Sequence, residues 1–171
     1  LGIDKNKPEK QQRNQTGSPI LEEGDILLNT TLAETNDWQQ VDLPVVRTLR
    51  HFCIETLSSY TEDNQACISE VDLLDDKGQP IDKTKWEVVY VSSEQADKNL
   101  GIAENLFDGD ISSFWHTDPA TEPGQPHRII VDIKEIYKIS ALRFKVRKGA
   151  FLSGKVKEIN VYGRPQFFLF H

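Results

Sequence analysis

The sequence predicts an all-β fold, a β-sandwich or jelly roll, on three observations. Short runs of strand-forming apolar residues recur along the chain between clusters of glycine, proline and aspartate. Residues 142–147 alternate strictly between apolar and basic side chains, which is the period of a strand with one buried and one solvated face. Helical periodicity is scarce, and only the polar segment 92–101 has room for a short helical turn. Several short strands with turn signals at regular spacing are typical of sandwiches and jelly rolls.

The expected strands share short length, apolar or alternating side chains, and flanking turn residues. A polar loop at 58–65 separates two of them, and a glycine-bounded loop at 148–154 separates two others. In chain order the expected strands lie at residues 26–28, 38–43, 51–57, 67–74, 86–91, 127–133, 141–147, 157–162 and 166–170.

Length and composition indicate one soluble globular domain. The 171 residues are enough for a domain that buries roughly two thirds of the surface its unfolded chain exposes. Residues 1–19 carry almost no apolar side chains after Ile3, so we expect a linker or tail there and a single domain over residues 20–171. No apolar run approaches the roughly 18 residues of a membrane span.

The charge of the chain bears on its partners. The net charge is −7 and the isoelectric point is near 5.1. Proteins that bind nucleic acids concentrate positive charge to displace counterions from phosphates, so we expect no nucleic-acid partner. Neutral or cationic ligands fit this balance better.

Two residue types bear on processing and redox state. Methionine is absent even from position 1, so we expect a processed mature form or a piece of a larger protein, and the lack of a signal peptide does not identify the compartment. Cys53 and Cys67 could form a disulfide if their Cα atoms lie within about 7 Å. The favoured interpretation is two unpaired, largely buried thiols.

Residues 105–118 are the densest concentration of specific chemistry. Gly109 stands where a tight bend would let neighbouring side-chain oxygens converge, as in loops that bind hard cations. Phe114 and Trp115 follow and are expected to pin the loop to the core. The oxygen-bearing side chains are those of Asn105, Asp108, Asp110, Ser112 and Ser113, and the polar cluster His116, Thr117 and Asp118 closes the stretch.

No catalytic constellation is evident. His116 and Asp118 are two residues apart and can share one face of a strand, but no nucleophile of matching context accompanies them. The acidic pairs at 22–23 and 75–76 are typical of solvated turns, whereas a glycosidase needs two carboxylates at a fixed separation in a cleft. We therefore expect that the protein is not an enzyme.

Successive motifs over most of residues 38–164 resemble the discoidin domain, the coagulation factor type C family whose bacterial members include carbohydrate-binding module family 32. The combination is specific, although each motif alone is weak. The motifs are residues 86–93, Asn105-Leu-Phe-Asp-Gly-Asp with Ser113-Phe-Trp-His, Pro126-His-Arg-Ile-Ile-Val-Asp-Ile, Leu142-Arg-Phe-Lys-Val-Arg and Gly154-Lys-Val-Lys-Glu-Ile-Asn-Val-Tyr. The resemblance implies a jelly-roll β-sandwich of the galactose-binding-domain type.

The order of the motifs is unusual. Arg50-His-Phe-Cys-Ile-Glu-Thr-Leu-Ser-Ser and Ile68-Ser-Glu-Val-Asp-Leu resemble strands that close the family's domain, but here they precede the tryptophan strand that normally opens it. The chain is either one circularly permuted domain or the tail of one domain followed by the truncated head of another. We favour the permuted domain, because half domains would expose unpaired sheet edges and raw core.

The resemblance also implies a structural Ca²⁺. Family members commonly ligate the ion through the Asp-Gly loop and a glutamate on the closing strand, here Asp108 and Glu70. Six oxygens suit Ca²⁺, and the lack of a Cys/His cluster argues against zinc. The alternative is that Asp108 and Asp110 only cap a turn through their own backbone. The candidate ligands are Asp108, Glu70, Asn105, Asp110, Ser113 and Ser69.

The function that the resemblance implies is non-catalytic binding of a glycan, usually a terminal galactose-like or amino sugar, at loops on one end of the sandwich. Such a site needs an aromatic face and a few polar donors. By motif position the candidates are His116, Arg147 and Tyr60, with Phe151 as another aromatic platform. The loop after Arg147 lacks the family's usual asparagine-glycine pair, and Tyr60 is offset from the usual aromatic position.

The resemblance places the chain outside the cytoplasm, as an appendage of a glycan-degrading or glycan-capturing protein. The alternative is an adhesion module in which the same loops bind another polypeptide. A membrane-binding module ranks last, because it would need apolar spikes flanked by basic residues at the loop tips.

Overall fold

Two long strands, β2 (Gln39–Thr56) and β6 (His127–Val146), pair antiparallel along most of their length and organise the whole sheet. The computed structural model describes residues 17–120, 124–146 and 154–171. In these residues one continuous antiparallel sheet has the strand order β1-β7-β2-β6-β3-β5, with β4 also paired to β6. The predicted all-β class is confirmed.

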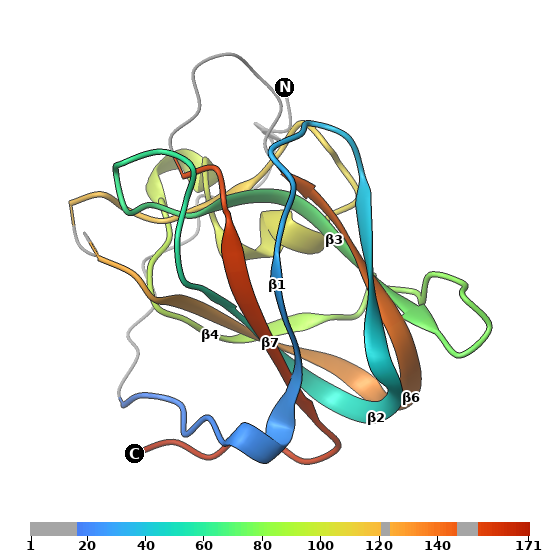
Figure 1. Cartoon of the computed structure of the whole chain (residues 1–171). Helices are drawn as coiled ribbons and strands as arrows, with labels where there is room; N and C mark the ends of the chain where they lie inside the picture. The colour runs from blue at the N-terminus through green and yellow to red at the C-terminus, as the bar shows by residue number, and fades with distance from the viewer. Residues whose placement is uncertain (1–16, 121–123, 147–153) are drawn as a thin grey trace.

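The sheet folds over on itself into two layers because β2 and β6 run through both (Figure 1). One layer holds β1 (Ile26–Thr31), β7 (Glu158–Arg164) and β4 (Glu87–Val91) around the C-terminal part of β2 and the N-terminal part of β6. The other holds β3 (Cys67–Asp75) and β5 (Trp115–His116) beside the C-terminal part of β6.

The bends in the long strands have local causes. The β2–β6 ladder is interrupted between Asp42 and Arg47, and Pro44, which has no N–H to give to a ladder, lies in that interval. On the facing strand Lys134 adopts a left-handed backbone conformation with φ 74°. Sequence analysis predicted separate strands at 38–43 and 51–57, and at 127–133 and 141–147. The structure corrects this, because each pair is one bent strand.

The helical content of the described residues consists of three short 3₁₀ segments: η1 (Glu23–Asp25), η2 (Asp97–Asn99) and η3 (Ala103–Phe107). The short helical turn expected in residues 92–101 is confirmed as η2. No helix in the described part of the chain combines the length and apolarity needed to cross a membrane.

The main core lies between the two layers. Its largest fully buried side chains include Trp115, Phe52 and Phe144. Trp86, the residue before β4, packs edge-on against Phe52 at 5.5 Å between ring centroids and against Phe107 of η3 at 5.6 Å. The core therefore joins segments from before and after residue 86. The single domain at 20–171 and its circular permutation stay predictions.

A second, smaller apolar cluster lies on the outer face of the β1-β7-β2-β6-β4 layer. It contains Cys53, Ile130, Tyr162 and Phe168, and residues near both ends of the described chain pack on it. These two segments are bound together by the bond from the Ile20 N–H to the carbonyl of Leu169 at 2.7 Å. The expected strand at 166–170 is wrong, because that segment makes only an isolated bridge to residue 19.

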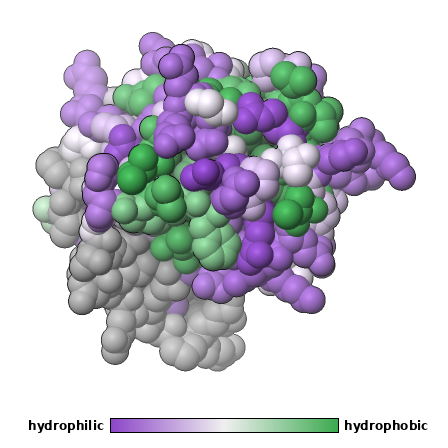
Figure 2. All heavy atoms as spheres, turned by 90° about the horizontal axis from the view of Figure 1, so that it is seen from below, coloured by the Kyte–Doolittle hydropathy of each residue, from purple (hydrophilic) through white to green (hydrophobic). Residues whose placement is uncertain are grey.

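The surface around residues 166–170, the C-terminal segment, carries both apolar and hydrophilic side chains. Figure 2, which views the molecule from below, shows apolar patches between hydrophilic side chains. Phe167 and Leu169 are the exposed apolar residues of this segment. Cys53 and Cys67 are both buried and are not joined by a disulfide, as the favoured interpretation predicted.

His51 couples the C-terminal segment to pH. Its buried imidazole stacks on Phe167 at 4.1 Å between ring centroids, and burial lowers the pKa of His51. The carboxylate of Asp132 opposes that shift, and the charges of Arg50 and Lys134 reinforce it. Because the pKa is lower in the folded state than the ordinary 6.5, the unfolded state takes up the proton first as the pH falls.

We therefore expect the stability advantage of the wild type over His51→Phe to shrink as the pH is lowered from 8 through about 6.5 to 5. Urea unfolding of both proteins at each pH measures the difference. His171→Phe, which removes an exposed imidazole, is the control. A difference that stays constant or grows toward acid would contradict the prediction.

Candidate functional site

Three neighbouring strands meet at the loop end of the molecule where the ligand residues were predicted. Cys67 pairs with His116, and the next residue, Ile68, pairs with both Trp115 and Val146. This row brings β5, β3 and the end of β6 side by side. The fully buried indole of Trp115 anchors the row by donating to the carbonyl of Ser93 at 2.9 Å, so its predicted role as a core residue is confirmed.

His116 lies in this row but is only 3% exposed. Its Nδ1 is 2.5 Å from the carbonyl oxygen of Thr117, and its ring meets Phe114 edge-on at 6.4 Å between centroids. Its main chain donates to the carbonyl of Gly101 at 3.1 Å. These contacts give His116 a structural part in the loop, and its contact with a sugar stays a prediction.

A buried polar network ties the loops at this end together. The Thr117 hydroxyl donates to Oε1 of Gln65 at 2.6 Å and accepts the N–H of Ala66 at 3.0 Å. Asp63 accepts the N–H of Gly154 at 3.1 Å. The end of the 58–65 loop is thus fixed, by buried hydrogen bonds at Gln65 and Ala66 and by the bond of the exposed Asp63.

Tyr60 belongs to the same end and is half-buried. Its main-chain N–H donates to the carbonyl of Lys155 and its hydroxyl to the carbonyl of Leu32, both at 2.7 Å. The ammonium of Lys157 lies 5.5 Å from the centre of its ring. The hydroxyl hydrogen is therefore used inside the protein, and the half-buried ring offers a contact surface for a ligand. Arg147 and Phe151 lie outside the described residues.

The Asp-Gly loop begins at the end of η3. Gly109 has a φ of 81°, which confirms the bend predicted for it. Asp108 accepts the N–H of Asp110 at 2.9 Å and the hydroxyl of Ser113 at 2.5 Å. Asp110 in turn accepts the N–H and hydroxyl of Ser112 at 2.9 and 2.6 Å. These bonds match the alternative interpretation, in which the two aspartates cap a turn.

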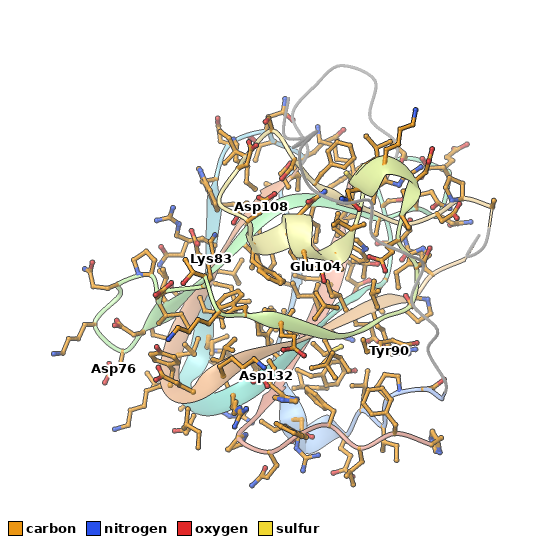
Figure 3. The ribbon with its side chains drawn as sticks, turned by 180° about the vertical axis from the view of Figure 1, so that it is seen from behind. Asp76, Lys83, Tyr90, Glu104, Asp108 and Asp132 are labelled. Carbon is orange, nitrogen blue, oxygen red and sulfur yellow. The ribbon has the colours of Figure 1, made fainter. Side chains whose placement is uncertain are left out.

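Glu70 of β3 meets this loop, as the resemblance implied. Its Oε2 accepts the N–H of Gly109 at 3.1 Å. Burial raises the pKa of Glu70 to about 7, the ammonium of Lys83 and the Gly109 N–H oppose the shift, and Asp108 adds to it. Lys83 also forms an ion pair with the same oxygen of Glu70, and Figure 3 shows Lys83 and Asp108 on the same side of the molecule.

The other predicted metal ligands are less suitably placed. The side-chain nitrogen of Asn105 donates to the carbonyls of Asn99, Leu100 and Phe114 at 3.2, 3.4 and 3.0 Å. These hydrogen bonds hold the loop together. Ser69 is buried within β3. In the described residues no cluster of three or more His, Cys, Asp or Glu side chains is arranged for a metal.

A Ca²⁺ ion needs six to eight oxygen ligands at about 2.3–2.6 Å. One feature suits it, because Oε1 of Glu70 is buried without a hydrogen-bond partner among the described residues. Against it, Oε2 of Glu70 is bound to Lys83, and both oxygens of Asp108 accept hydrogen bonds. As placed, these residues do not fit a Ca²⁺ centre that uses Glu70 and Asp108 together.

Sequence reasoning missed Lys83 and Gln65. Lys83 stands in a polar stretch with another lysine two residues later, and no local pattern distinguishes the one that meets Glu70. Gln65 ends a polar loop, where burial is not expected. For this part of the site the sequence signals were the Asp108-Gly109 pair and the resemblance that singled out Glu70.

The comparisons with known proteins agree with the motifs. Residues 88–166 match the sequence profile of the F5/8 type C domain. The chain is also similar to a protein named sialidase from Micromonospora viridifaciens, at 33% identity over 84 residues. That alignment covers 48% of this chain and 13% of the sialidase, so the chain spans a small part of that protein's length. The resemblance to the type C family and its galactose-binding-like sandwich is confirmed.

The left-handed conformation of Gly109 gives a test of the loop. A Cβ at Gly109 or at Gly24 would meet no atom within 4 Å, but only Gly109 has a positive φ. We expect Gly109→Ala to lower the unfolding free energy by about 1–2 kcal/mol, and Gly24→Ala to change it by less than about 0.5 kcal/mol. Chemical denaturation measures both. Equal effects would argue against a strained bend at Gly109.

Proposed function

Residues 88–166 belong to the F5/8 type C domain family, and from this premise we propose that the chain is a non-catalytic carbohydrate-binding module whose loop end holds the sugar. The observation that carries the proposal is the row of paired residues Trp115–Ile68–Val146. It sets β5, which carries the candidate contact His116, and the end of β6 at Val146 on the same part of β3.

The chemistry of this end supports a sugar ligand. A sugar offers an apolar C–H face and several hydroxyls, so it is recognised by an aromatic ring with a few fixed polar groups. The ring of Tyr60 is held by two hydrogen bonds of its own residue, and the nearby loops carry polar side chains. Rigid surroundings of this kind lower the entropy cost of ordering the site on binding.

We propose a terminal galactose-like or amino sugar as the ligand, with Arg147, His116 and an aromatic from Tyr60 or Phe151 as the contacts. The net charge of −7 is compatible with neutral or amino sugars. The relative named sialidase is much longer than the region of similarity, which supports an appendage of a larger glycan-acting protein. An extracytoplasmic setting follows from that proposal.

Glycan-array screening followed by calorimetric titration of the best glycan tests this function. We expect Arg147→Ala to weaken the Kd at least about tenfold, because removing a charged hydrogen-bond donor from a bound ligand costs about 1.5–3 kcal/mol. The Tm of this variant should equal that of the wild type.

Lys138→Ala is the control for this experiment, since it removes an exposed positive charge from β6 in the stretch that joins the two layers. Its Kd should stay within about twofold of the wild type. A wild-type protein that binds no glycan on the array would overturn the proposal, and specific capture of a polypeptide would favour the adhesion alternative.

A further inference from the structure

The ammonium of Lys83 contacts three consecutive residues of β3. It forms an ion pair with Oε2 of Glu70, a second with Oδ1 of Asp72 at 2.6 Å, and a hydrogen bond to the carbonyl of Val71 at 3.1 Å. An ammonium has three N–H donors, and three acceptors on three consecutive residues of β3 use all of them. Its side chain is only 17% exposed.

Glu70 needs a positive partner. Its side chain is 2% exposed, and an uncompensated charge at such a site destabilises a protein strongly. The Gly109 N–H supplies a dipole but no net charge. Asp108, the residue before Gly109, brings a second carboxylate to the same region. Among the described residues Lys83 is the cation that contacts Glu70.

The backbone around Lys83 holds it at this place. Lys83 lies on the connection between β3 and β4, which folds back along β3 through the bond from the Ile81 N–H to the carbonyl of Leu73 at 3.0 Å. The carbonyl of Lys83 accepts the N–H of Trp86 at 3.3 Å, and Trp86 is buried in the core. The side chain of Lys83 therefore extends from a hydrogen-bonded turn that lies beside β3, the strand that carries Glu70.

The connection between β3 and β4 joins two motifs that the sequence analysis singled out. Glu70 lies on a strand that resembles the closing strand of the family, and Trp86 opens the strand that resembles its first. In this chain residues 76–86 join those two strands directly. The joining segment is therefore the part of the chain that delivers Lys83 to the carboxylate.

A dication at Glu70 would compete with Lys83. Its ligands would have to include a carboxylate already paired with the ammonium, and two positive charges a few ångströms apart repel each other where water is largely excluded. Of the two carboxylate oxygens of Glu70, Oε1 is the one without a hydrogen-bond partner among the described residues. Entry of Ca²⁺ would therefore require the ammonium of Lys83 to leave three acceptors.

We propose that Lys83 is a built-in replacement for the structural Ca²⁺, and that its ammonium holds Glu70 and the Asp108–Gly109 loop together without a metal. The inference does not depend on sugar binding, because it is argued from the contacts of Lys83 with Glu70, Val71 and Asp72.

Thermal unfolding in 1 mM EDTA and in 5 mM CaCl₂, with 5 mM MgCl₂ as the control for ionic strength, tests the replacement. The wild-type Tm should be the same in all three buffers within about 1 °C, since a ligand bound only by the folded state would raise it. A Ca²⁺-specific rise of several degrees in the wild type would overturn the proposal.

Lys83→Met keeps the apolar length of the side chain and removes the charge. We expect its Tm in EDTA to fall by about 5–10 °C, because Glu70 loses its partner. Ca²⁺ should then raise the Tm of this variant by more than it raises the wild-type value. Lys85→Met makes the same change at an exposed residue of the same connection and should shift the Tm by less than about 2 °C.

The double variant Glu70→Gln with Lys83→Met separates charge pairing from packing, and it covers the outcome in which Lys83→Met does not fold. Removal of both charges should restore at least half of the lost Tm, since no unpaired carboxylate remains. A double variant as unstable as Lys83→Met, or a Lys83→Met variant as stable as the wild type in EDTA, would show that Lys83 does not act as the proposed cation.

Discussion

The antiparallel pairing of β2 with β6 is the constraint on which the other elements depend. These two strands cross from one layer of the sheet to the other together, so each supplies ladder partners to both layers. β7 adds to β2, while β3 and β4 add to different parts of β6. Because the side-chain period of a strand is two, a slip of one residue in the β2–β6 register would put the apolar faces of β2 and β6 on opposite sides of the sheet.

The same pairing positions the two chemical regions of the protein. The last residue of β6, Val146, pairs with Ile68 of β3, and on the other side of β3 lies β5, which carries His116. Two residues along β3 stands Glu70, which reaches the Asp-Gly loop and Lys83. β3 therefore borders the proposed sugar-binding end and also carries Glu70, the buried carboxylate that holds the neighbouring loop.

Much of the fold was predictable because strand signals are local. Alternation at residues 142–147 and the turn residues between apolar runs identified the buried faces and most strand positions. The continuity of β2 through Pro44 was not predictable, since proline ordinarily excludes a paired strand and the interruption of the ladder there is a tertiary feature. The segment at 166–170 has apolar strand-like residues, but it packs on the outer face at Cys53 and Tyr162 and joins no ladder.

Residues 105–118 were the part of the sequence with the clearest chemistry. By itself the sequence determined the bend at Gly109, the burial of Trp115 and the approach of Glu70 to the loop, because side-chain type, spacing and motif order carry that information. Only the tertiary structure decided which cation accompanies Glu70. The partner, Lys83, lies on a different segment of the chain. The turn in the β3–β4 connection brings this lysine, and not its neighbours in the sequence, to Glu70. Charge pairing depends on distance in space, which neither the spacing nor the composition of the chain contains.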